Sequence, residues 1–278
     1  MIRYQLLKYL RRPRFYFMAV GIGILKYLAV FTADAQINRM VFSEKSYMGS
    51  IFSVNYMNQW LNFLEYGVLC MCAYAVSGGV LEDISEQMYD YLFVRVSVTK
   101  YCAGKVIAMV IAGFLCMSMG CIVFYLMNTI FPGLPLFPAI DSGEALNYSK
   151  LLSEILGQQN FALFLILQIV QYSCFGVVVS LLVMMISLVI HDFKFLITLP
   201  IIFMYFFVNV FRFKNMTWLN IFYSPYEVYC RLLGANDFVP EGIPIDLISF
   251  GFPVLYTILA AILAYILLFR TVRKWKVQ

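Results

Sequence analysis

Two charged side chains and two glutamines stand inside long apolar runs of this 278-residue sequence: Lys26, Glu65, Gln168 and Gln171. Charged groups are costly in hydrocarbon, so those found there commonly pair with one another or mark a substrate or ion path. Helical rise places Lys26 about 10 Å, and Glu65 about 8 Å, below the outer ends of their runs. If these helices are neighbours, we expect an ion pair with a possible part in gating or in the substrate path. The alternatives are a purely structural pair and a Lys26 that reaches the interface between tilted helices.

Glutamines inside apolar runs have two uses. Gln168 and Gln171 are candidates for lining a polar path, but hydrogen bonding between neighbouring helices is the commoner use. Patterns for catalysis and nucleotide binding are missing from the sequence, which has no GxxxxGK[ST], HExxH or GxSxG segment. Its one histidine, His191, stands beside Asp192 in an expected tight turn. We therefore expect no catalytic residue, cofactor or metal, and energy for any uphill transport must come from another chain or an ion gradient.

Residues 82–105 form a polar stretch with helix signals between two apolar runs. Asp83 and Glu86 have capping-box spacing, in which both side chains satisfy backbone N–H groups of a helix's first turn. Apolar residues then recur at helical spacing from Ile84 to Leu92. We expect a short amphipathic helix that docks into a soluble partner, the alternative being a helix that floats in the membrane interface. The residues assigned to this docking surface are Glu82, Asp83, Glu86, Met88, Tyr91, Leu92 and Arg95.

The composition indicates an integral membrane protein. Hydrophobic residues make up 63% of the chain and charged residues 13%, about half the charged share of a soluble domain. Nucleic-acid binding is not expected, because the basic residues lie at the ends of apolar runs and form no stripe. The seven cysteines include no CxxC pair. Most lie in apolar segments, where a free thiol packs as a small hydrophobe, so no disulfide framework is implied.

Apolar runs of about 20 residues predict membrane-spanning helices. Six runs qualify: residues 15–33, 60–80, 106–131, 161–190, 195–211 and 247–269. Residues 1–14 alternate basic and apolar side chains, which is typical of an amphipathic helix on an anionic membrane surface. Residues 214–246 are too apolar for an exposed loop and too broken to span, which favours an outer helical hairpin. The sequence therefore predicts an all-α membrane protein with one six-helix domain over residues 1–278.

The distribution of basic residues predicts the orientation. Thirteen Lys and Arg residues fall on one side of the expected spans and six on the other. The side richer in Lys and Arg is normally cytoplasmic. Both termini and residues 82–105 are therefore expected in the cytoplasm of a multi-pass cell-membrane protein.

This arrangement resembles the type-2 ABC exporter permeases, the membrane subunits of ATP-binding cassette transporters. Glu82 matches the family's Glu after span two, Val96-Ser97 falls in its turn, and Gly104-Lys105 matches its Gly-Lys entering span three. Ser224-Pro225 before the last span is similar to the family's outer hairpin. Arg95 stands where the family usually has proline.

The resemblance implies a mechanism and partners. The helix between spans two and three would be a coupling helix inserted into a cytoplasmic ABC ATPase, which the N-terminal helix would also contact. A second permease chain, identical or related, would complete the path for an exported peptide, lipid-like or drug-like substrate. The alternatives are an ion-coupled secondary transporter, which would favour more carboxylates within spans, and a non-transporting membrane sensor or immunity subunit.

Overall fold

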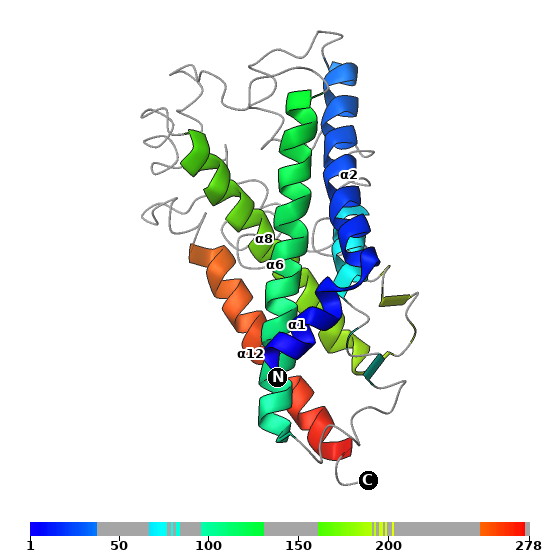
Figure 1. Cartoon of the computed structure of the whole chain (residues 1–278), viewed down its shortest axis with the longest axis vertical. Coiled ribbons are helices and arrows are strands. Elements are labelled where there is room, and N and C mark those ends of the chain that lie inside the picture. Colours follow the sequence, from blue (N-terminus) through cyan, green and yellow to red (C-terminus); the bar gives the residue numbers. More distant parts are fainter. Residues whose placement is uncertain are drawn as a thin grey trace, which may run out of the picture.

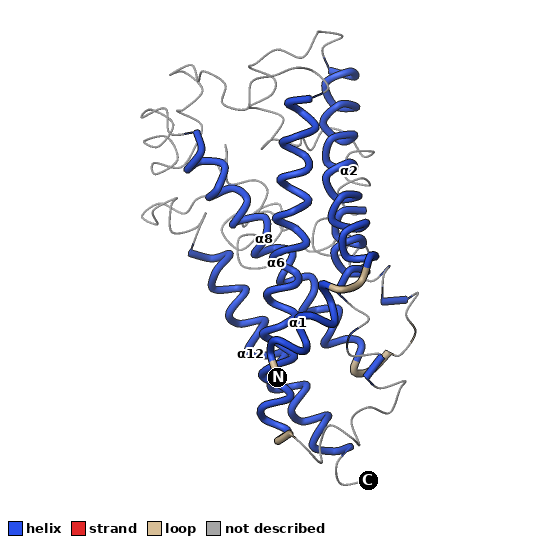
Figure 2. Tube along the Cα trace, viewed as in Figure 1, coloured by secondary structure: helices blue, strands red, loops and turns tan. Residues whose placement is uncertain are grey.

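The computed structural model describes residues 1–37, 67–76, 79, 82–83, 96–130, 161–190, 192, 195–196, 198, 202 and 251–275. The regular structure in these ranges is helical, with no strand, which confirms the all-α prediction for this part of the chain (Figure 2). The long helices are α1 (Ile2–Leu10), α2 (Pro13–Ile37), α6 (Val98–Ile130), α8 (Phe161–Ser187) and α12 (Phe252–Trp275).

The N-terminal segment folds as two helices joined by a corner. The Arg11 amide donates to the Leu7 carbonyl at 3.0 Å, and the Arg12 amide donates to the Tyr9 carbonyl at 3.2 Å. Pro13 then begins α2, a position that suits proline because the first helical residue needs no amide donor. The amphipathic helix expected over residues 1–14 therefore ends four residues early, at Leu10.

Helix α6 is the central element of the described structure. It packs against α1, α2, α8 and α12 (Figure 1), and its 33 residues correspond to a length of about 50 Å. The helix begins at Val98, directly after the bend at Val96 and Ser97. The Tyr101 amide donates to the Ser97 carbonyl at 3.0 Å. The third expected span, residues 106–131, is thus the later part of a longer helix, and residues 98–105 belong to that helix rather than to a separate connection.

Glycines allow α6 to approach two neighbours closely. A Cβ atom on Gly23 of α2 would lie 2.8 Å from the carbonyl oxygen of Gly120 of α6. A Cβ atom on Gly113 of α6 would lie 2.7 Å from Ser180 Oγ and 3.4 Å from the Gly176 carbonyl oxygen, both of α8. Helices in membranes commonly associate through such small residues, because these bring the backbones into van der Waals contact. The sequence of α6 therefore fixes one close crossing with α2 and another with α8.

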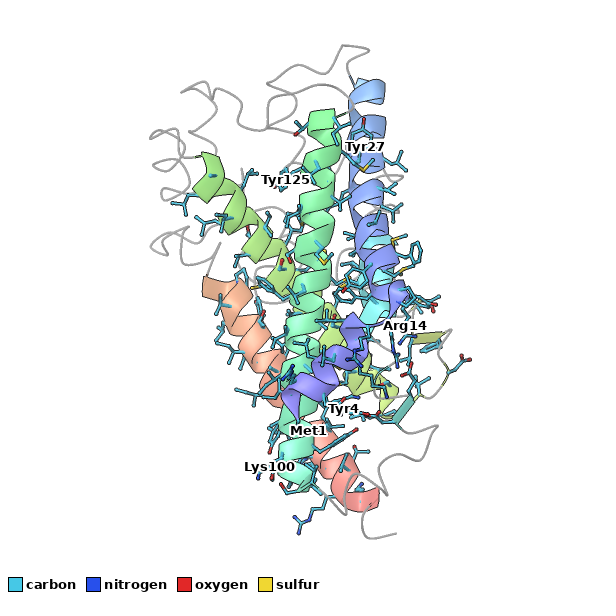
Figure 3. The ribbon with its side chains drawn as sticks, viewed as in Figure 1. Met1, Tyr4, Arg14, Tyr27, Lys100 and Tyr125 are labelled. Carbon is cyan, nitrogen blue, oxygen red and sulfur yellow. The ribbon has the colours of Figure 1, made fainter. Side chains whose placement is uncertain are left out.

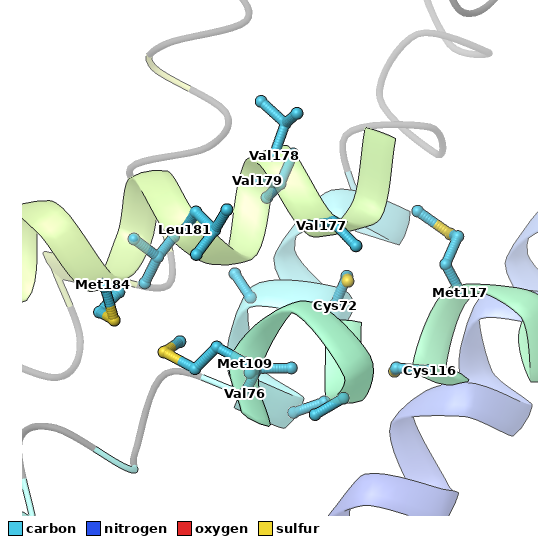
Figure 4. Close-up of a cluster of buried hydrophobic side chains, with 14 of the residues drawn as sticks. Cys72, Val76, Met109, Cys116, Met117, Val177, Val178, Val179, Leu181 and Met184 are labelled. Atoms are coloured by element: carbon cyan, nitrogen blue, oxygen red, sulfur yellow. The ribbon is translucent and has the colours of Figure 1, made fainter. Parts of the chain in front are cut away.

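The helical residues 67–76 contribute to the buried core between these helices. Gly21 of α2 faces the Met71 side chain, because a Cβ atom there would lie 2.8 Å from the Met71 sulfur. On another side, the Cys72 thiol lies 3.6 Å from the Gly176 carbonyl oxygen of α8, in the apolar cluster drawn in Figure 4. The six cysteines in the described ranges are free thiols. Five of them are buried, and Cys70 is partly buried, which agrees with the sequence-based interpretation of most cysteines as small hydrophobic residues.

Three stretches in the described ranges are long and apolar enough to cross a membrane: Val98–Met127, Leu165–Ser187 and Pro253–Lys274. They suggest a membrane protein. The stretch in α8 is 78% buried within the chain, whereas the stretch in α12 is only 11% buried. The outer surface of α12 is therefore an apolar face available to lipid or to another chain. The expected outer hairpin at residues 214–246, most of the fifth expected span and about half of the second lie outside the described residues.

Candidate functional site

A buried carboxylate joins the N-terminal helix to the central helix. Asp83 is 3% exposed, and its Oδ1 accepts a hydrogen bond from Lys8 Nζ of α1 at 2.7 Å. Its Oδ2 accepts hydrogen bonds from the Tyr101 hydroxyl at 2.8 Å and from Lys105 Nζ at 2.5 Å, both on α6. One side chain therefore holds donors from two helices that are separate in the sequence.

Lys105 is the cation at the centre of this arrangement. Its side chain is fully buried. Its ammonium group donates to the Gln5 Oε1 of α1 at 3.1 Å, to the Gly79 carbonyl at 2.6 Å and to Asp83. An ammonium group has three N–H donors, so each donor of Lys105 has an acceptor. A buried ion pair is stable only when its remaining donors and acceptors are also satisfied, and this pair meets that condition.

Glu82 binds the cations at the corner between α1 and α2. The Arg12 guanidinium donates to both of its carboxylate oxygens. Arg14 donates to Oε1 at 3.0 Å, and Lys8 lies 3.6 Å from Oε2. The Glu82 side chain is 25% exposed, so this pairing lies nearer to solvent than the Asp83 pairing. We call the whole set the ionic cluster; it comprises Gln5, Lys8, Arg12, Arg14, Glu82, Asp83, Tyr101 and Lys105.

Tyr9 places α1 against the backbone at Gly79. A Cβ atom on Gly79 would collide with the Tyr9 hydroxyl and ring, so only glycine leaves room for this side chain. The Tyr9 ring centroid lies 5.8 Å from Lys105 Nζ. Gln5 and Tyr9, four residues apart, are the buried residues of α1, because that spacing puts them on one helix face. This face of α1 points toward α6, and Figure 3 shows α1 lying across α6.

The electrostatics keep both carboxylates ionised. Burial alone would raise the pKa of Asp83, but Lys105 and Lys8 outweigh burial and hold that pKa below its usual range. Burial acts on Glu82 in the same way, and Arg12, Arg14 and Lys8 lower its pKa overall. The pKa of Tyr9 is raised by burial and by the Asp83 carboxylate, so Tyr9 stays neutral. Both carboxylates of the cluster are therefore ionised near neutral pH.

Two of the residues assigned to the docking surface belong to this cluster. Asp83 is buried and its carboxylate oxygens bind Lys8, Tyr101 and Lys105. It therefore faces the interior of the chain. Glu82 is partly exposed but is occupied by Arg12 and Arg14. The other five assigned residues lie outside the described residues: Glu86, Met88, Tyr91, Leu92 and Arg95. Their docking role stays a prediction.

Lys26 of α2 lies among aromatic rings and a thiol. Its Nζ is 3.4 Å from the Tyr172 ring centroid on α8 and 6.0 Å from the Phe124 ring centroid on α6. The Cys121 sulfur of α6 lies 3.9 Å away. A cation over an aromatic face is stabilised by the negative potential of the ring. The structure thus places Lys26 at the junction of three helices.

The remaining polar candidates are placed only in part. Glu65 and the Gln168 side chain lie outside the described residues, so the pairing of Lys26 with Glu65 stays a prediction. Gln171 of α8 is buried at 3% exposure. Within the described ranges, no group of three or more His, Cys, Asp or Glu side chains could hold a metal ion.

The sequence patterns did not indicate the part that Gln5, Tyr101 and Lys105 play in the ionic cluster. One signal was present in the sequence of α1. Gln5 and Tyr9, four residues apart, lie on the helix face opposite the exposed Arg3 and Arg11. The partner residues on α6 were not predictable in the same way, since they are almost 100 residues away in the chain. The sequence matches no family model, no curated protein and no solved structure.

Proposed function

We propose that this chain is the membrane-spanning permease subunit of an ABC transporter, which exports a substrate with ATP hydrolysed by a separate subunit. The observation that supports this most is the ionic cluster. It fastens α1, residues 82–83 and the start of α6 to one another through the buried Asp83 and Lys105. The partner subunits would be cytoplasmic ABC ATPases and a second permease chain.

The cluster gives a physical route from a partner to the membrane helices. Residues 84–95 leave the cluster at Asp83 and return to the start of α6. A displacement applied to these residues would reach α6 as a rigid-body movement, because ion pairs from two helices hold both ends of the connection. A flexible connection would absorb the same displacement. The proposed ATPase would therefore act on α6 through a stiff base.

The substrate path is the less defined part of the proposal. Lys26, Phe124 and Tyr172 meet where α2, α6 and α8 converge. Such a junction suits an amphipathic peptide, lipid-like or drug-like molecule with an apolar body. The role of Lys26 in this path is part of the proposal.

A photo-crosslinking experiment tests the partner. A photoreactive amino acid would replace Tyr91, in the expected docking helix, in the full chain expressed with its natural neighbours in its own membrane. The control places the same amino acid at Ile122, which is 47% exposed on α6 and expected to face lipid. Irradiation should join the Tyr91 position, and not the Ile122 position, to a protein carrying a GxxxxGK[ST] motif. Tyr91→Ala and Arg95→Glu should lower ATP turnover of the purified complex.

Two results would contradict the proposal. One is a Tyr91 position that captures no ATPase while both substitutions leave ATP turnover unchanged. The other is a tag within residues 84–95 that reagents reach only from outside intact cells. Transport that persists without ATP and stops when an ionophore removes the ion gradient would favour the ion-coupled alternative.

A further inference from the structure

The basic residues that the structure describes, apart from Lys26, fall into two groups. Four are held in the ionic cluster by Glu82 and Asp83: Lys8, Arg12, Arg14 and Lys105. Six are exposed: Arg11 at the corner between α1 and α2, and, at the end of the molecule where α6 starts, Arg3, Lys100, Arg270, Arg273 and Lys274. We call the last five residues the basic rim. The charge of the first group is used inside the chain, whereas the basic rim presents its charge outward.

The basic rim is assembled from three helices. Arg3 lies in the first turn of α1 and Lys100 in the first turn of α6. The other three residues lie in the last turns of α12. Both α1 and α12 pack against α6, and a Cβ atom on Gly104 of α6 would lie 3.0 Å from the Met1 side chain. The start of α6, the start of α1 and the end of α12 all lie at the same end of the molecule (Figures 1 and 3).

Packing turns the basic side chains of α12 outward. Leu268 and Val272 are fully buried, and a helix that buries these two positions must expose much of its opposite side. Arg270, Arg273 and Lys274 lie on this exposed side. Their orientation therefore follows from the packing of α12 on the rest of the chain.

The basic rim lies where an apolar surface ends. Ile258, Ile262 and Ile266 form an exposed apolar row along α12, and the first rim residue of this helix, Arg270, follows one turn later. On α1, Tyr4 is 56% exposed beside Arg3. Tyrosine is enriched at the headgroup level of membranes, because its ring is apolar and its hydroxyl is polar. In a membrane-embedded chain, these positions put the basic rim at the depth of lipid phosphates.

We propose that the basic rim binds the phosphate headgroups of anionic lipids. Clusters of four to eight Lys and Arg residues beside a spanning helix attract anionic lipids, and this rim has that size and position. The inference requires that the chain lies in a membrane, but it does not require an ATPase partner. The main competitor for this surface is an acidic face of a soluble partner protein, which the test must separate from lipid.

The test uses the purified full chain without any partner. Native mass spectrometry would count the lipids retained from mixed micelles that contain phosphatidylglycerol and phosphatidylcholine in equal amounts. The wild-type chain should retain phosphatidylglycerol preferentially, and added phosphatidylglycerol should raise its thermal midpoint. Changing all five rim residues to Gln should weaken phosphatidylglycerol binding about tenfold or more, because each basic residue near the surface adds to the attraction.

Controls separate charge, fold and ligand source. A variant with Arg3, Arg270 and Arg273 all changed to Lys keeps the charge of the rim. It should keep most of the phosphatidylglycerol binding. Arg11→Gln removes an exposed charge at the other end of α1 and should change binding little. If the variant with all five rim residues changed to Gln does not fold, two double variants replace it: Arg3→Gln with Lys100→Gln, and Arg270→Gln with Lys274→Gln. Each should lower phosphatidylglycerol binding by a smaller factor.

Three results would overturn the inference. The first is equal retention of phosphatidylglycerol by the wild-type chain and by folded variants whose rim residues are changed to Gln. The second is inorganic phosphate raising the thermal midpoint as much as the lipid does, which would indicate a site for soluble anions. The third requires a separate pull-down in which soluble proteins are added: rim variants that retain the lipid but lose a soluble partner captured by the wild-type chain would assign the surface to protein. Because no ATPase is present, a failure here leaves the proposed transport function to its own test.

Discussion

Changing Asp83 to Asn removes one charge from the ionic cluster while keeping the size of the side chain. Lys105 would then keep Gln5 and the Gly79 carbonyl as acceptors, but its charge would be buried without a carboxylate beside it. Removing one partner of a buried ion pair typically costs about 3–5 kcal/mol of folding free energy. At roughly 2–4 °C per kcal/mol for chains of about this size, the thermal midpoint should fall by roughly 6–20 °C.

The measurement is the thermal midpoint of the purified chain in one fixed detergent. Glu82→Gln is the matched control, because its carboxylate is 25% exposed and partly exposed ion pairs contribute about 1 kcal/mol or less. The double variant Asp83→Asn with Lys105→Met removes both buried charges and should recover most of the loss, since neutral apolar replacement of a buried pair is often tolerated. Two results would refute the reasoning. One is an Asp83→Asn variant with the same thermal midpoint as the Glu82→Gln variant. The other is a double variant that is less stable than Asp83→Asn alone.

Three further predictions follow from the same structure. Gly79→Ala should lower the thermal midpoint and make α1 more accessible to proteases, because the new methyl group would occupy the place of the Tyr9 ring. Adding Tyr9→Leu to this variant should restore much of the lost stability. Gly23→Ala should lower the free energy of unfolding by about 1–3 kcal/mol through overpacking. Gly104→Ala should be tolerated, because its Cβ would meet only the flexible Met1 side chain and the start of α1. Equal thermal midpoints for the two variants would contradict this. The lowered pKa of Asp83 means that its stabilisation is complete at neutral pH and is lost only as pH falls below about 4. The contribution of Asp83 to the thermal midpoint should therefore stay constant from about pH 7 to about pH 5. A decline already near pH 6 that Asp83→Asn abolishes would contradict this.

The sequence predicted the helical class and the positions of the long helices, because runs of apolar residues determine both. Residues 15–33 lie within α2, and residues 161–190 contain α8 with three residues beyond it. Helix ends were less predictable. The rule that charged residues lie outside spans placed the start of the third helix after Lys105. In the structure, helix α6 starts before Lys105 because Asp83 and Gln5 satisfy that charge in the interior.

The candidate site was predictable in outline only. The acidic residues after the second apolar run were singled out, and Asp83 was assigned to a helix cap and to a docking surface. The contacts that the structure describes for Asp83 include Lys8 and Lys105, which are 75 and 22 residues away in the chain. Local spacing identifies caps and amphipathic faces, whereas the choice between internal and external partners for a carboxylate depends on which helices pack together. The internal partners of Asp83 are evident only in the folded structure, in which α1 packs against α6.

The glycine contacts of α6 limit how this helix can move. It meets α8 at Gly113 and α2 at Gly120, so rotation about its own axis would drive side chains into both neighbours. Tilting about these two contacts is the movement that leaves them intact. Val98 then lies about 22 Å on one side of them and Ile130 about 15 Å on the other, counted by helical rise, and the two ends would swing in opposite directions. Lys26 contacts Cys121 and Phe124, just beyond Gly120, where the tilt produces almost no displacement. Lys26 therefore lies near the fulcrum of such a tilt, and the displacement would be largest at the two ends of the helix.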